Sequence, residues 1–222
     1  HVGKLLNIRN IAAVGPGEIS KVRGSLHVFP TPEDDKRRFR VIKHPAAYNE
    51  HHDRTTVRNR ANATRRSARH AILLGDGAIL LDFSAFFDLI PLHESASWCQ
   101  VFKAEGKIWR NCRLPMGSRH STQIATSLTR VLLAFDIPPT VHVDHATDNI
   151  RFCGSKNAVT ATAWEFVLRC RRAGARINEI NIDTATREDV ASLWRTSGCD
   201  FLGEVADHTE KTICCRPKHI ER

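Results

Sequence analysis

The apolar run GAILLDF, residues 77–83, is the feature that most constrains the fold of this chain. Its residues are compatible with β structure and carry no charge before Asp82, so the run predicts a strand that is buried on both faces. Burying the carboxylate of Asp82 at the end of such a strand is costly unless a partner compensates its charge. A metal ion is one such partner.

Length and composition allow one sizeable core, or a core with a smaller subdomain, because the chain has 222 residues and is 41% hydrophobic. The sequence has no run of about 18 apolar residues and no signal peptide at its start. We therefore expect an intracellular protein, cytoplasmic or nuclear, with no membrane partner. Because the sequence starts with His1, we also expect it to be part of a longer polyprotein with further domains.

The positive charge is concentrated in residues 36–70, which hold eleven Lys and Arg residues against two acidic ones, whereas the rest of the chain is balanced. Such a stretch is typical of a surface that binds nucleic acid, although an ordinary solvated face is the alternative. A helix predicted from about Thr55 to Leu74 would place four arginines in one stripe that follows a phosphate backbone. These are Arg54, Arg58, Arg65 and Arg69.

The remaining patterns alternate between strands and helices. Short strands and turns are predicted for residues 12–33, and a strand is predicted to end at Pro45. The other predicted elements are a hairpin in 98–117 that turns at 105–107, a helix over 121–135, two strands around a polar turn in 140–154, a helix over 158–172 before Gly174, a short helix over 186–196 and strands in 199–215. This order favours an α+β fold with helices on one face of a sheet.

Two-metal phosphoryl transfer requires at least two carboxylates from separate strands, which hold two Mg²⁺ ions about 4 Å apart. Asp82 is one candidate ligand, and an aspartate in the hairpin VHVDHATDNIRF is the other. That hairpin offers two alternatives, because its turn can be formed by Asp148 and Asn149 or by Asp144 and His145.

The stretch LDFSAFFDLIPL, residues 81–92, resembles the first catalytic motif of the reverse transcriptase family of retroelements. The resemblance implies that Asp82 is a metal ligand and that Phe87 is the steric gate under the sugar of the incoming nucleotide. CRLPMGSRHSTQIATS, residues 112–127, is similar to the next motif, in which L-P-x-G opens a loop into a long helix. That match implies that Gly117 lies near the nucleotide.

TDNIRFCG, residues 147–154, resembles the family's hairpin with two adjacent aspartates, which implies that Asp148 binds metal and that Asn149 replaces the second carboxylate. This register is preferred because it keeps the I-x-F-x-G pattern that follows. RRFRVIKHPAAYN resembles the fingers strand, so Arg38 and Arg40 would face the triphosphate. RRAGARIN and DFLGEV are similar to the family's closing element and to its primer-gripping hairpin. A core position for Phe87 and solvated positions for the two arginines are the alternatives.

The resemblance implies an α+β right-hand polymerase with palm and fingers, an antiparallel sheet and a truncated thumb. The expected domains are fingers over 1–78, a palm over 79–210 with a fingers-type insertion at about 93–116, and the start of a thumb over 211–222. Within the family, the motif wording is most similar to the DIRS-like, tyrosine-recombinase elements of trypanosomatids.

The function implied is RNA-directed DNA polymerisation with Mg²⁺ or Mn²⁺ as cofactor. The expected partners are an RNA or DNA template with its primer and deoxynucleoside triphosphates. Two alternatives belong to other classes. One is a decayed retroelement domain that binds nucleic acid without catalysis, and the other is an unrelated two-metal nuclease or nucleotidyltransferase.

Overall fold

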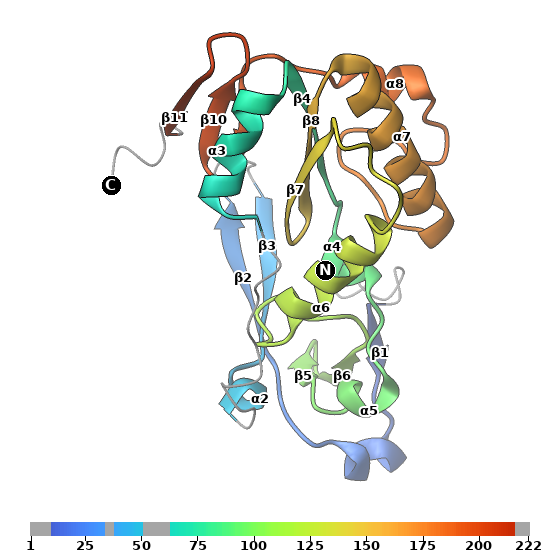
Figure 1. The fold of residues 1–222 in the computed structure, drawn as a ribbon. Coiled ribbons are helices and arrows are strands. Elements are labelled where there is room, and N and C mark those ends of the chain that lie inside the picture. The colour runs from blue at the N-terminus through green and yellow to red at the C-terminus, as the bar shows by residue number, and fades with distance from the viewer. Residues whose placement is uncertain (1–9, 34–37, 51–62, 216–222) are drawn as a thin grey trace. The chain divides into compact units, whose positions relative to one another are not determined.

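The computed structural model describes residues 10–33, 38–50 and 63–215, and Figure 1 shows their helices and strands. The chain divides into two compact units. The first comprises His1–Asn59 and Phe87–Ala125, and the second comprises Arg60–Phe86 and Thr126–Arg222. All pairs of named strands are antiparallel, so the described part of the chain combines helices with antiparallel sheets. None of the described helices has the length and apolar character needed to cross a membrane.

The first unit contains a three-stranded sheet of order β1-β6-β5 and a two-stranded sheet of β2 and β3. A buried apolar cluster of Ile11, Leu26, Phe102 and Trp109 forms its core. Its elements are β1 (Ile11–Ala13), η1 (Pro16–Lys21), β2 (His27–Glu33), β3 (Arg38–His44), α2 (Ala46–Glu50), α4 (Phe86–Leu89, which starts at the boundary), α5 (Glu94–Ser97), β5 (Val101–Ala104) and β6 (Lys107–Asn111).

Most predicted elements of the first unit are confirmed. β3 ends directly before Pro45, and β5 and β6 form the predicted hairpin. Its turn residues Glu105 and Gly106 have φ angles of 51° and 70°, the left-handed pair that a tight hairpin requires. The prediction of only strands and turns before residue 33 was wrong, because Pro16–Lys21 forms a 3-10 helix. Proline at the start of this helix fits its fixed φ and missing N–H.

The second unit contains one sheet of order β4-β8-β7 and another of order β11-β10-β9. Helix α7 packs against β4 and β8, and helix α3 packs against β8 and β7. Its elements are α3 (Arg65–Leu74), β4 (Gly77–Asp82), α6 (Ser121–Leu132, which starts in the first unit), β7 (His142–Ala146), β8 (Asn149–Gly154), α7 (Lys156–Ala173), α8 (Arg187–Ser192), β9 (Cys199–Phe201), β10 (Glu204–Asp207) and β11 (Thr212–Cys215).

The two faces of the β4-β8-β7 sheet differ in what covers them. On one face, the ring of Phe166 from α7 lies 5.6 Å from Phe152 of β8 and 5.9 Å from Phe83. Because side chains alternate along a strand, Asp82 and Asn149 belong to the opposite face. That face is packed, away from its aspartate end, by buried residues of α3, β9 and β10, which form a cluster of Ala71, Ile72, Ala78, Cys153, Cys199 and Ala206.

Three predicted helices of the second unit are confirmed with small shifts in their ends. α7 spans Lys156–Ala173, and Gly174 ends it in the left-handed conformation with φ 67°. Only glycine adopts this conformation without steric cost, so its position explains why the predicted end was close. α6 and α8 are shorter than predicted, since they stop at Leu132 and Ser192.

The prediction of one continuous helix from Thr55 to Leu74 was wrong, because Ala63 and Thr64 are not helical and α3 begins at Arg65. Residues 55–62 lie outside the described residues. Thr64 is extended, with φ −95° and ψ 158°, and its hydroxyl accepts a hydrogen bond from Ser67 N. The Ser67 hydroxyl in turn accepts from Thr64 N at 3.0 Å. This reciprocal cap satisfies two N–H groups that a longer helix would have bonded itself.

The four-arginine stripe predicted on that helix therefore does not lie on α3. Ala63 and Thr64 are not helical, so Arg65 and Arg69 are separated from the earlier arginines by an extended segment. Arg54 and Arg58 lie outside the described residues. The side chain of Arg69 forms an ion pair of 2.6 Å with Glu204. Phosphate binding by these arginines stays a prediction.

Candidate two-carboxylate site

The strand that ends at Asp82 pairs in register with the hairpin that contains Asp148. Asp82 lies directly opposite Asn149, the first residue of β8. One residue further, Phe83 N donates a hydrogen bond of 3.0 Å to Asp148 O. Directly opposed residues of antiparallel strands have Cα atoms about 4.5–5.5 Å apart. The backbones of Asp82 and Asp148, which are distant in the sequence, are therefore neighbours within the second unit.

The hairpin turn consists of Thr147 and Asp148, because β7 ends at Ala146 and β8 begins at Asn149. Asp144 and His145 lie inside β7, so the alternative in which they form the turn was wrong. The I-x-F-x-G pattern favoured the register that has Asp148 in the turn, and this part is confirmed. The turn lies one residue earlier than predicted, because Thr147 belongs to it and Asn149 is the first residue of β8.

The turn adopts a strained conformation. Thr147 has φ 58°, which is unusual for a β-branched residue and costs about 1–3 kcal/mol. The hydroxyl of Thr129 in α6 is buried and donates a hydrogen bond of 2.5 Å to Thr147 O. This contact holds the carbonyl of the strained residue, so the turn next to Asp148 is fixed by its neighbours.

The carboxylate of Asp82 has a partner that the sequence did not indicate. Asn178 Nδ2 donates a hydrogen bond of 2.6 Å to Asp82 Oδ2, and Glu179 Oε2 accepts one of 3.0 Å from Asp82 N. Asn178 is the last residue of RRAGARIN, the stretch that resembles the family's closing element. No pattern along the chain links it to Asp82, because the two lie on elements almost a hundred residues apart.

Asp148 and Asn149 also interact, since Asn149 Nδ2 donates a hydrogen bond of 3.2 Å to Asp148 Oδ1. Asp82 and Asp148 are half-buried, and Asn149 is exposed. Carboxylate oxygens are the ligands that Mg²⁺ prefers, and polymerase sites hold it with one or two carboxylates plus substrate phosphates. The two aspartates fit this minimal donor set. The described residues contain no cluster of three or more His, Cys, Asp or Glu side chains suited to a metal.

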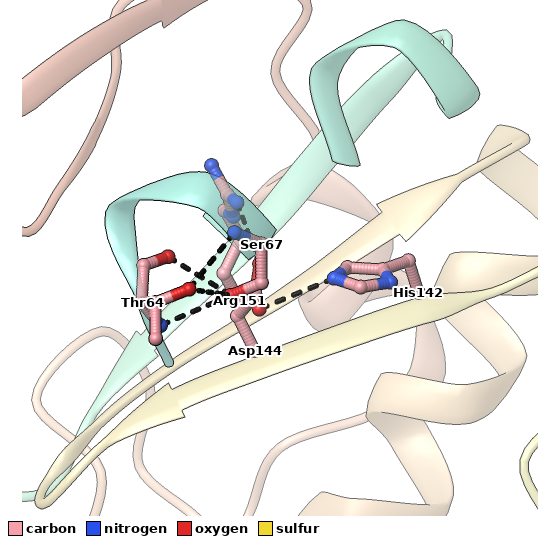
Figure 2. A network of polar contacts seen from close by, with 5 residues as sticks. All are labelled: Thr64, Ser67, His142, Asp144 and Arg151. Atoms are coloured by element: carbon pink, nitrogen blue, oxygen red, sulfur yellow. Dashed lines mark hydrogen bonds and ion pairs between the residues drawn. The ribbon is translucent and has the colours of Figure 1, made fainter. Parts of the chain in front are cut away.

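A buried ion pair links β7 and β8 close to the hairpin turn. Arg151 of β8 donates from Nη2 to Asp144 Oδ2 at 2.6 Å, and His142 Nε2 lies 3.1 Å from Asp144 Oδ1 (Figure 2). The guanidinium of Arg151 also lies 4.8 Å from the ring centroid of Phe201. Burial opposes ionisation of Asp144, but hydrogen bonds from His142 and Arg151 outweigh it and lower the pKa of this carboxyl below its usual range. Asp144 is therefore a structural carboxylate.

The remaining predicted nucleotide-binding residues belong to the first unit. Arg38 and Arg40 lie on β3 opposite Glu33 and Thr31. Phe87 is half-buried in α4. Asp82 and Asp148 belong to the second unit. The roles of Arg38, Arg40 and Phe87 toward a nucleotide stay predictions.

Gly117 is held by a contact that the sequence did not reveal. Its φ is 101°, a conformation that favours glycine. Asn49 Nδ2 donates a hydrogen bond of 2.9 Å to Gly117 O, and Asn49 Oδ1 accepts one of 2.9 Å from Arg119 N. The amide of Asn49 therefore fixes the L-P-M-G loop on both sides of Ser118.

Solved structures with a similar fold decide the fold assignment. Two structures of a foamy viral protease-reverse transcriptase in complex with double-stranded DNA have a TM-score of 0.71 and 19% sequence identity to this chain. They cover 98% and 99% of it. The chain has a reverse-transcriptase-like fold. A native prototype foamy virus protease-reverse transcriptase gives a TM-score of 0.62 at 21% identity over 79% of the chain.

This chain spans only part of those proteins, since it matches 34%, 41% and 22% of their respective lengths. No protein-family model matches the sequence, and no curated protein matches it. At these identities the likeness concerns the fold alone.

Proposed function

We propose that the chain is the polymerase core of an RNA-directed DNA polymerase from a retroelement, with a palm and fingers and the first residues of a thumb. The reaction is attack of a primer 3′-hydroxyl on the α-phosphate of a deoxynucleoside triphosphate, directed by an RNA or DNA template, with pyrophosphate as the leaving group. Further domains of a longer polyprotein would accompany it. The DIRS-like subfamily stays a prediction from motif wording.

One observation carries this proposal: the end of β4 at Asp82 is in register with the hairpin turn at Asp148. The backbones of the two aspartates are therefore neighbours at one end of an antiparallel sheet, and two carboxylates from separate elements are the donor set that two-metal phosphoryl transfer requires. The reverse-transcriptase-like fold supports the same reaction class, and the double-stranded DNA in two of the similar structures supports a nucleic-acid partner.

Asp82 and Asp148 are the residues that would hold Mg²⁺ or Mn²⁺, and the bound metal would supply Lewis acidity toward the phosphate oxygens. The fixed turn and the Asn178 contact orient the two carboxylates. Phe87 would exclude the 2′-hydroxyl of a ribonucleotide. The other proposed contacts are with the triphosphate and the nascent base pair for Arg38, Arg40 and Gly117, and with the template-primer backbone for Arg54, Arg58, Arg65 and Arg69.

A second candidate function is nucleic-acid binding without catalysis. Its support is Asn149, which stands where the family's second aspartate is expected and whose amide bonds to Asp148. An amide adds no negative charge, so the site has one carboxylate fewer to attract divalent cations. Polymerase sites function with one or two carboxylates, which is why we favour catalysis.

Primer extension tests the proposal. The wild-type chain is incubated with a labelled primer on an RNA template, with all four deoxynucleotides, and with Mg²⁺ or Mn²⁺ present or omitted. Metal-dependent lengthening that follows the template supports the polymerase. Binding without lengthening supports the second candidate, whereas shortening or untemplated addition supports an unrelated nuclease or nucleotidyltransferase.

A further inference from the structure

The segment that follows helix α7 runs antiparallel to the end of β4. Ser84 N donates a hydrogen bond of 2.8 Å to Arg176 O, and Asn178 N donates one of 2.8 Å to Asp82 O. Between these bonds, Phe83 and Ile177 form an isolated antiparallel bridge. Asp82 therefore lies between two neighbours, with the Asp148 hairpin on one side and this segment on the other.

Two consecutive residues of this segment contact Asp82 with their side chains. The amide of Asn178 donates to Asp82 Oδ2 at 2.6 Å, and the carboxylate of Glu179 accepts from Asp82 N at 3.0 Å. Together with the backbone bond from Asn178 N, three hydrogen bonds fix both the main chain and the carboxylate of Asp82. A short bond to a charged acceptor is among the stronger kinds of hydrogen bond.

Buried residues on the N-terminal side of Asn178 fix the position of its backbone. Gly174 ends α7, and Ala175 N returns to Cys170 O with a hydrogen bond of 2.9 Å. Ala175 and Ile177 are buried, whereas Asn178 and Glu179 are exposed. The backbone of the segment is thus anchored in the core. The Asn178 amide is presented at the surface toward a carboxylate of the candidate site.

We propose that Asn178 is a positioning residue, which holds the carboxylate of Asp82 in the orientation that binds the divalent cation. This inference rests on the proposed function, because that function assigns Asp82 to the metal. Residues that hydrogen-bond a metal ligand fix its geometry, and their loss typically lowers metal affinity or activity about 10–100-fold. Asn178 stands in this relation to Asp82.

A positioning role and a purely structural role for Asn178 predict different effects of its removal on the melting temperature and on metal binding. The side chain of Asn178 is exposed, so water can take the place of its amide in the folded protein, and the two backbone bonds of the segment do not depend on that amide. Removing the amide should therefore leave the melting temperature nearly unchanged while it weakens metal binding. A structural residue would show the reverse pattern.

Mn²⁺ binding tests the proposal directly, because it does not require turnover. The full chain, loaded with a primer-template, is titrated with Mn²⁺ and the free ion is followed by electron paramagnetic resonance. Asn178→Ala is expected to weaken Mn²⁺ binding about 10–100-fold. Asn181→Ala is the matched control, since Asn181 is an exposed amide of the same segment whose Oδ1 accepts from Asp183 N. The control should bind Mn²⁺ within about twofold of the wild type, well below that range.

The inference is overturned if wild type and Asn178→Ala bind Mn²⁺ equally, if both variants weaken binding equally, or if the wild type binds none. Nucleotide addition is measured on the same samples to separate this result from the proposed function. A wild type that adds nucleotides while Asn178→Ala keeps full Mn²⁺ affinity removes the positioning role alone. A wild type that adds none but loses Mn²⁺ affinity with Asn178→Ala removes the polymerase proposal and keeps the positioning role.

Discussion

Arg151 donates a hydrogen bond of 2.6 Å to Asp144, and the two side chains are only 2% and 4% exposed. They lie directly opposite each other on β7 and β8, the two strands that are joined by the turn containing Asp148. Breaking a buried ion pair leaves one charge without compensation, which typically costs about 3–5 kcal/mol. The two aspartates of the hairpin therefore have different roles: Asp144 is structural, and Asp148 is the proposed metal ligand.

Asp144→Asn should destabilise the fold, whereas Asp148→Asn should not. We expect a loss of about 3 kcal/mol in the free energy of unfolding for Asp144→Asn, because the buried guanidinium of Arg151 loses its counter-charge. Asp148 is half-buried in the turn, so its variant should stay within about 0.5 kcal/mol of the wild type. Urea unfolding followed by circular dichroism measures both values. Equal stability of the two variants would show that the buried pair does not support the hairpin.

Acid should remove the contribution of Asp144 in the wild type. The pKa of Asp144 is lowered in the folded state, so its stabilisation is complete above the unfolded value of about 3.9 and is lost as the pH falls through the folded pKa. The difference in unfolding free energy between wild type and Asp144→Asn should therefore be full at pH 6 and should shrink below about pH 4. Urea titrations at a series of pH values measure it. A difference that stays constant down to pH 2.5, more than one unit below that value, argues against the lowered pKa.

Phe87 should control the choice of sugar if it is the steric gate. Phe87→Ala removes the ring that would contact the 2′-position, so the use of ribonucleotides relative to deoxynucleotides should rise, by roughly 10-fold or more for a contact worth about 1–3 kcal/mol. Competing single-nucleotide additions measure the ratio. Phe87 is half-buried, so circular dichroism must first show that the variant is folded. An unchanged ratio in a folded variant would make Phe87 an ordinary packing residue.

The arginines of the basic stretch should determine how binding depends on salt. Replacing Arg54, Arg58 and Arg65 with Gln should reduce the slope of log K against log salt by up to about 0.9 for each lost duplex contact. Arg69 already pairs with Glu204 at 2.6 Å, so adding Arg69→Gln should change the slope less than each of the others. Fluorescence anisotropy with a primer-template at several salt concentrations gives the slopes. If Arg69→Gln changes the slope of log K against log salt more than any of the other three replacements, the ion pair with Glu204 does not compete with phosphate.

Turns and helix ends were predicted best, because neighbouring residues in the sequence determine them. The polar residues left two places for the β7–β8 turn, and the I-x-F-x-G pattern that follows put it within one residue of its position. The end of α7 was placed by Gly174, because helix caps are encoded by neighbouring residues. The start of α3 differs from the prediction because Thr64 and Ser67 form an N-terminal cap, and the predicted helix ran across this cap without a break.

Long-range contacts could not be predicted in the same way. Asn178 meets Asp82 only because the chain reverses after α7, and no periodicity in the sequence encodes that approach. Asp144 and Arg151 are a partial exception. Once the turn is placed at Thr147 and Asp148, strand register alone pairs them across the hairpin. Their burial still depends on β9 and α3, which are distant in the sequence.

Single-nucleotide addition by wild type, Asp148→Asn and Asn149→Asp tests the central claim most directly. We predict that the wild type adds only the nucleotide complementary to the template. Asp148→Asn should lose on the order of 100-fold or more in rate with nearly unchanged primer-template affinity, as expected for a group that stabilises transition-state charge. Asn149→Asp should keep or raise the rate at low Mg²⁺, because it restores a second carboxylate beside Asp148. Equal rates for folded wild type and Asp148→Asn would contradict the assignment of the turn aspartate to catalysis.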